Sequence, residues 1–89
     1  MSATVTLDFP VLFQGNRHAT LTVRRCKVRD RIAATRGGGD DGEKEVRLFA
    51  NLCEVDPAVI MEMDEVDYAK LQTAYLGFTR GDTASPEKP

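Results

Sequence analysis

The sequence predicts an α+β fold in which an N-terminal antiparallel β-hairpin packs on about three α-helices. Up to residue 23 the apolar residues recur at every second position, as in strands, and from residue 27 they recur at every third or fourth position, as in helices. The chain has 89 residues, of which 42% are hydrophobic and 29% are charged. This balance fits one small globular domain. We expect that domain to span residues 1–78, and the polar residues 79–89 to form a disordered tail.

We expect the hairpin to occupy residues 3–23. The apolar residues that alternate with polar ones are Val5, Leu7 and Phe9 in the first strand and Ala19, Leu21 and Val23 in the second. Pro10 ends or bends the first strand, and Gln14-Gly15-Asn16 supplies turn residues that tolerate positive φ. A hairpin alone is marginally stable in water, so helices must cover its apolar face.

Four helical segments are predicted, at residues 27–36, 42–53, 57–62 and 64–78. The first has apolar residues at Val28, Ile32 and Ala33 and is halted by three consecutive glycines at 37–39. The apolar residues of the second segment are Val46, Phe49, Ala50 and Cys53, at helical spacing. Asp56 is placed to cap the third segment, which has a proline at its first position.

The last helix, residues 64–78, carries the most informative pattern. Asp64 is placed as its cap, and the acidic residues of its first turn favour the positive end of the helix dipole. Four large side chains then form one seam: Tyr68, Leu71, Tyr75 and Phe78. We expect Tyr68 and Leu71 to pack onto the hairpin, and Tyr75 and Phe78 to reach a partner protein or a second copy of the chain.

Charge is distributed unevenly along the chain. Residues 1–36 carry seven Lys/Arg and two Asp/Glu, a net charge of +5, whereas residues 37–89 carry five and twelve, a net charge of −7. Such opposed ends can pair within one fold or between copies.

The sequence offers no constellation for catalysis or metal binding. His18 is the only histidine, and the two cysteines, Cys26 and Cys53, are 27 residues apart without a C-x-x-C spacing. The three glycines lack the spacing of a phosphate-binding loop. We therefore expect no enzymatic activity and no cofactor, with both cysteines reduced. Because the sequence also shows no apolar stretch long enough to span a membrane and no secretory signal, we expect a cytoplasmic protein.

The basic run RRCKVRDR at residues 24–31 is the main signal for another function. Its five positive side chains could neutralise phosphates. The acidity of the whole chain and the absence of nearby aromatic residues argue against nucleic-acid binding. The other interpretations are a solvated helix start, or a patch in which Arg24, Arg25 and Lys27 meet an acidic protein surface.

Three motifs together carry a resemblance to a known family. They are L-x-x-R-R-x-K-V-x-D at residues 21–30, M-D-x-x-D-Y-x-x-L-Q at 63–72, and G-F at 77–78. Over residues 4–78 the chain resembles the small tail assembly chaperones of Mu-like contractile-tailed bacteriophages and prophages. It departs from the family at Cys26, where proline is frequent, and at Cys53 and Glu54, where a Thr-Gly pair is frequent.

The resemblance implies a protein without enzymatic activity that coats the long tape measure protein and keeps it soluble until tube subunits polymerise around it. It also implies that a frameshifted, C-terminally extended form recruits the tail tube protein. We expect self-association, a location in the bacterial host cytoplasm and absence from the mature virion. Two rival functions stay open: a nucleic-acid-binding accessory protein acting through residues 24–31, and a structural tail component that persists in the particle.

Overall fold

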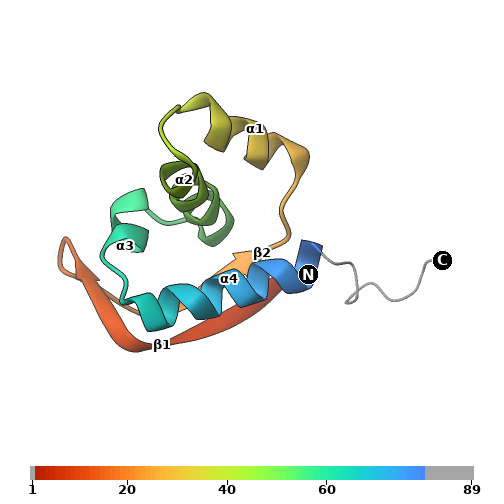
Figure 1. Ribbon diagram of the computed structural model, residues 1–89. Coiled ribbons are helices and arrows are strands. Elements are labelled where there is room, and N and C mark those ends of the chain that lie inside the picture. Colours follow the sequence, from red (N-terminus) through yellow and green to blue (C-terminus); the bar gives the residue numbers. More distant parts are fainter. Residues whose placement is uncertain (1, 80–89) are drawn as a thin grey trace.

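The structure, a computed structural model, describes residues 2–79, and of Thr79 only the backbone. Its elements are β1 (Ser2–Phe13), β2 (Asn16–Arg24), α1 (Val28–Arg36), α2 (Asp41–Cys53), α3 (Pro57–Met61) and α4 (Glu65–Thr79) (Figure 1). The predicted hairpin followed by helices is confirmed, and the helix bounds differ from the expected ones by one residue or less. The predicted disordered tail lies outside the described residues apart from position 79. No helix within residues 2–79 is both long enough and apolar enough to cross a lipid bilayer.

The hairpin has one polar and one apolar face. Threonines pair across its outer face, Thr4 with Thr22 and Thr6 with Thr20. Its inner face carries side chains that are all buried: Val5, Leu7, Leu21 and Val23. Gln14 and Gly15 form the turn with φ of 50° and 80°, the left-handed geometry that matches the twist of a two-residue hairpin.

The register of the hairpin breaks between Thr6 and Val11. Pro10 lies in this break, so it bends β1 without ending it. The break also corrects one expectation. Phe9 was predicted to lie on the inner face but is 56% exposed, and Val11, at 4%, is the next buried residue of the strand.

Asp67 of α4 holds this bend of β1. Its two carboxylate oxygens accept hydrogen bonds from the backbone N–H groups of Asp8 and Phe9, at 2.8 and 2.9 Å. Lys70 lies 3.4 Å from the same carboxylate and 3.0 Å from that of Asp8. Two backbone N–H groups of β1 that lie in the break of the strand pairing are thereby hydrogen-bonded to a side chain of α4.

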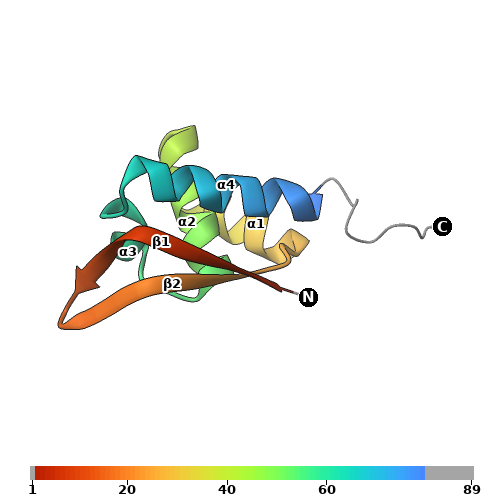
Figure 2. The same ribbon diagram turned by 90° about the horizontal axis from the view of Figure 1, so that it is seen from below.

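One core lies between the hairpin and the helices. Figures 1 and 2 show α4 running alongside β1, and α2 crossing behind α4. The core residues with 1% exposure or less are Val23, Phe49, Leu52, Val59 and Leu71. Because α4 extends along the length of the hairpin, residues from both ends of this helix can reach the core.

Local signals in the sequence set the helix ends. Asp56 and Asp64 accept hydrogen bonds from backbone N–H groups two residues ahead, each at 2.9 Å, and this confirms both predicted caps. Asp40 and Glu43 form a reciprocal capping box at the start of α2. At the end of α2, Glu54 adopts a left-handed φ of 58°, a conformation usually taken by glycine.

Candidate partner-binding surfaces

The seam of α4 faces the core along its whole length. Leu71 is fully buried, and Phe78 is only 5% exposed. Tyr68 and Tyr75 are half-buried. The centres of their rings lie 5.6 and 5.4 Å, respectively, from the centre of the Phe49 ring. Leu71 therefore packs as expected. The expectation that Phe78 points outward is wrong, because the last turn of α4 still lies over the core.

Polar contacts hold the two tyrosines in place. Arg31 donates a hydrogen bond to the Tyr75 hydroxyl at 2.7 Å. The Tyr68 hydroxyl donates to Glu45, which also accepts from Gln72. Burial and this bond to a carboxylate raise the pKa of Tyr68. Neither tyrosine is presented to solvent as a free aromatic anchor.

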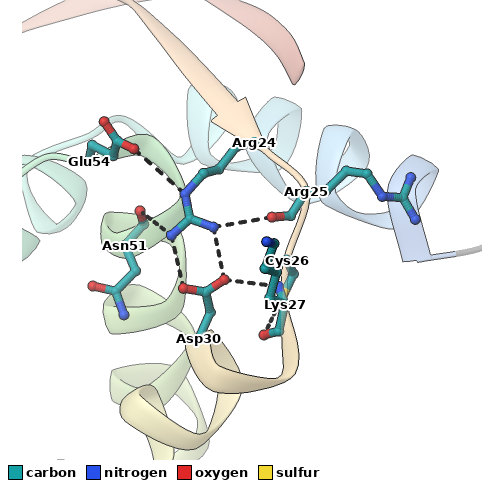
Figure 3. A network of polar contacts seen from close by, with 7 residues as sticks. All are labelled: Arg24, Arg25, Cys26, Lys27, Asp30, Asn51 and Glu54. Carbon is teal, nitrogen blue, oxygen red and sulfur yellow. Dashed lines mark hydrogen bonds and ion pairs between the residues drawn. The ribbon is translucent and has the colours of Figure 1, made fainter. Parts of the chain in front are cut away.

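Arg24 and Asp30 form a bidentate ion pair where β2 runs into α1 (Figure 3). Two nitrogens of Arg24 each lie 2.9 Å from a different carboxylate oxygen of Asp30. Asp30 also accepts the backbone N–H of Lys27 at 2.9 Å, and Arg24 donates to the carbonyl of Asn51 on α2 at 3.3 Å. The pair thus connects β2, α1 and α2.

This ion pair changes the electrostatics of the basic run. The Arg24 guanidinium, and after it the Lys27 N–H, hold the pKa of Asp30 well below its usual range. Arg24 is a structural residue as a consequence, and not the free cation that the sequence suggested.

The other cations of the run divide into two groups. The Arg25 guanidinium lies 5.7 Å from the centre of the Phe78 ring, which is within range of a cation–π contact, and Arg31 is bonded to Tyr75. Lys27 and Arg29 are exposed and form no ion pair within the described part of the chain. Three of the five cations of the run therefore already contact other side chains of the fold. Fewer of them are available to neutralise the phosphates of a nucleic acid than the composition suggests.

Two carboxylates are buried although no pattern in the sequence indicated it. Asp30 is 5% exposed and Asp67 is fully buried. Burial raises the pKa of Asp67, but the N–H donors of Asp8 and Phe9 together with Lys70 outweigh it, and the net pKa is lowered. Asp30 lies three residues beyond Lys27, a spacing that signals a cap. Asp67 had no such signal, because its donors are 58 and 59 residues away.

The outward face of α4 begins with the exposed Glu65 and is uncharged beyond it. We call its four uncharged exposed residues the α4 stripe: Val66, Ala69, Thr73 and Leu76. At about 100° per residue they fall within an arc of about 80°. Val66 and Leu76, at its two ends, are 51% and 50% exposed. Apolar residues on both faces are typical of a helix that packs against other structure on both sides.

A second exposed apolar surface is on α1. Val28 is 76% exposed and Ile32 is 51% exposed, and we call this pair the α1 ridge. Asp30 and Ala34 face inward in their place. The apolar residues that marked this segment as a helix thus lie on its outer side, because the Arg24–Asp30 pair turns the opposite side of α1 toward α2.

A groove opens between the start of α2, α3 and the start of α4. Its volume is about 580 Å³, within the size range of ligand and peptide sites. The apolar lining residues are Val46, Pro57, Met61 and Tyr68, and the acidic ones are Asp40, Glu43 and Glu45. We call it the acidic groove. Arg47 also lines it, but the Arg47 guanidinium donates to the carbonyls of Ala34 and Gly38.

The described residues supply no group of three or more His, Cys, Asp and Glu side chains placed to hold a metal ion. Cys53 is buried, as expected, and burial raises its thiol pKa to about 11, while Cys26 is only partly buried. What the molecule offers at its surface is the α4 stripe, the α1 ridge and the acidic groove, all of them suited to contacts with protein.

Comparison with known proteins supports this interpretation. No curated protein and no solved structure matches the chain. The protein-family model of the phage tail assembly chaperone proteins, described as "E, or 41 or 14", matches residues 4–80. That match covers the hairpin from residue 4 onward and the four helices of the described part of the chain. The chain therefore belongs to the family of phage tail assembly chaperone proteins.

Proposed function

We propose that this tail assembly chaperone binds the tape measure protein of its phage through the α4 stripe and keeps that protein soluble until the tail tube forms around it. Family membership gives the class of function. The observation that carries the site is the stripe itself, which places exposed apolar residues on a helix whose other face is already in the core.

The dimensions of the α4 stripe suit a helical partner. From residue 66 to residue 76 it extends about 15 Å, or three turns. The two central residues, Ala69 and Thr73, are small, which allows a second helix to approach to about 8–10 Å. Val66 and Leu76 at the ends supply apolar contacts for an amphipathic helix. Lys70 does not interrupt the stripe, because it is turned toward Asp8 and Asp67, and the exposed Glu65 precedes the stripe at the start of the helix.

The double variant Ala69→Glu/Thr73→Lys tests this site. It places two charges in the centre of the stripe, and their spacing of four residues favours a Glu–Lys pair that preserves the helix. Co-expression with the tape measure protein should then leave that protein insoluble, and pull-down should fall at least about tenfold. Wild-type chaperone should keep it soluble under the same conditions.

A matched control places the same two charges elsewhere. Thr4→Lys/Thr22→Glu forms an opposite-charge pair across the outer face of the hairpin, where these threonines are directly paired. The control should bind as well as the wild type, and both variants should give a folded circular dichroism spectrum. Equal binding by wild type and stripe variant would refute the site, and a tape measure protein that stays insoluble with wild-type chaperone would refute the function.

We further propose the finer features that the family resemblance implies: a Mu-like contractile-tailed phage or prophage as the source, action in the host cytoplasm, and a frameshifted form that recruits the tail tube protein. A chaperone acts before the particle is finished, so mass spectrometry of purified virions should find the tube protein but not this chain. Its presence at a fixed copy number would favour a structural tail component instead.

A further inference from the structure

Phe9 is an exposed aromatic residue at a position where strand alternation would bury it. Val5 and Leu7 are 6% and 5% exposed, so residue 9 is the next inward position of β1, yet Phe9 is 56% exposed. The break in the strand pairing turns this side chain outward, which is a common effect of an irregularity in a strand. Within residues 2–79 its ring takes part in no aromatic pair and no cation–π contact. A large apolar side chain is thus left uncovered.

The exposure of Phe9 is maintained by dedicated interactions. Asp67 is fully buried, and burial of a charge is unfavourable unless the charge is well paired. Its two oxygens hold the backbone N–H groups of Asp8 and Phe9 in the bend, and Lys70 pairs with the same carboxylate. A regularly alternating strand would bury Phe9 and would not need this carboxylate. Departures from a local rule that are held in this way are expected at functional positions.

The bend places Phe9 next to the α4 stripe. The N–H of Phe9 lies 2.9 Å from Asp67, and Val66, the first residue of the stripe, directly precedes Asp67. Figures 1 and 2 both show the bend of β1 beside the first turn of α4. The neighbouring charges of Asp8 and Lys70 are paired with each other at 3.0 Å, so they do not oppose an apolar contact. The apolar surface of the stripe therefore continues from the helix onto the strand.

We propose that the helix of the tape measure protein that lies on the α4 stripe also buries the ring of Phe9, which makes Phe9 the aromatic anchor of the binding site. This inference rests on the proposed function, because it extends the same site toward the same partner. The stripe itself offers only small or aliphatic side chains, whereas buried aromatic residues contribute most at protein interfaces. The apolar face of the partner helix should therefore continue about one turn beyond Val66, with a small residue where it receives the ring.

Replacement of Phe9 by threonine tests the anchor, and Leu12→Thr is the matched control. Both side chains are exposed, at 56% and 72%, and both belong to β1. Leu12 lies beyond the bend, opposite Arg17 and close to the turn. Threonine is the residue that already pairs across the outer face of the hairpin, so both variants should give a folded circular dichroism spectrum. Phe9→Thr should weaken pull-down of the tape measure protein at least about tenfold, and Leu12→Thr should bind like the wild type.

A fluorescent probe tests the contact itself and retains an aromatic ring at the site. The sequence has no tryptophan, so Phe9→Trp and Leu12→Trp each introduce a single one. Complexes with the tape measure protein are purified after co-expression, and the spectrum of the wild-type complex is subtracted to remove the emission of the partner. The tryptophan introduced at position 9 should emit at shorter wavelength in the complex than in the free protein, because its ring leaves water. The tryptophan introduced at position 12 should not shift.

Failure of this inference is distinguishable from failure of the proposed function. If Phe9→Thr binds like the wild type while Ala69→Glu/Thr73→Lys does not bind, the stripe is the site and Phe9 is not its anchor. Equal losses in Phe9→Thr and Leu12→Thr, or equal spectral shifts at the two positions, would mean that the partner binds the whole hairpin arm, which also overturns the inference. A wild type that binds no tape measure protein refutes the proposed function, and the anchor falls with it.

Discussion

Helices α1 and α4 use their apolar residues in opposite ways. In α4 the predicted seam is inside, with Leu71 fully buried and Phe78 5% exposed. In α1 the predicted apolar residues are outside, and a carboxylate, Asp30, occupies the inner face. Both helices have the expected bounds to within one residue, so apolar spacing located each helix, but the apolar residues mark the buried face only in α4.

The difference comes from what each helix finds opposite it. Helix α4 lies along the apolar inner face of the hairpin, and large side chains gain by burial there. Helix α1 begins four residues after Arg24, whose guanidinium needs a charged partner where it approaches α2. Asp30 supplies that partner, and α1 turns accordingly. An ion pair can thus set the rotation of a short helix that carries few large apolar residues.

The largest expected effect sharpens the contrast within α4 itself. Leu71→Ala should lower the free energy of unfolding by about 2 to 5 kcal/mol, because it leaves a cavity in a fully buried site. Leu76→Ala, in the same helix but half exposed, should cost about 1 kcal/mol or less. Urea titration of both variants measures the difference. Equal losses would mean that α4 has no distinct inner and outer face.

The next effect concerns the ion pair that turns α1. Asp30→Asn keeps the shape of the side chain but removes its charge, and should cost about 2 kcal/mol at pH 7. The folded-state pKa of Asp30 is depressed, so its contribution is present above the unfolded pKa of about 4 and is lost as pH falls toward the folded pKa. Urea titrations at several pH values should therefore show the two proteins converging below about pH 4. A constant gap down to low pH would show that the charge of Asp30 is not what stabilises the junction.

The smallest effect is expected at the α1 ridge. Val28→Gln/Ile32→Gln should change the stability of the monomer by less than about 0.5 kcal/mol, since both side chains are already exposed. Urea denaturation of the variant and the wild type, at the same low protein concentration, is the appropriate measurement. A loss of several kcal/mol would mean that the ridge packs inside, and the contrast between α1 and α4 would no longer hold.

The fold was largely predictable because its signals are local. Alternation in the strands, the Gln14-Gly15 turn and the caps at Asp56 and Asp64 each depend on a few neighbouring residues. The break in the register of β1 was not predictable in the same way. Pro10 indicated a bend, but the hydrogen bonds that hold the bend come from Asp67, at the other end of the folded chain.

The surface proposed here lies on the helix that the sequence singled out, but on the face opposite the predicted seam. Tyr75 and Phe78 are the largest side chains near the end of α4, and their size suggested anchors for a partner. In a domain this small, large aromatic residues are needed for the core. The exposed residues of α4 are smaller, and nothing in their spacing separates them from an ordinary solvated face. The acidic groove joins three helices, so no single segment of the sequence could have indicated it.

The contact of Asp67 with β1 has a consequence for synthesis of the protein. The chain is made from its N-terminus, and both strands of the hairpin leave the ribosome before any residue of α4. The carboxylate that holds the bend of β1 becomes available only once residue 67 has emerged, when most of the 89 residues exist. A fragment that ends before residue 67 contains the complete hairpin sequence but lacks the group that fixes its shape. Completion of the hairpin is therefore coupled to the arrival of the last helix.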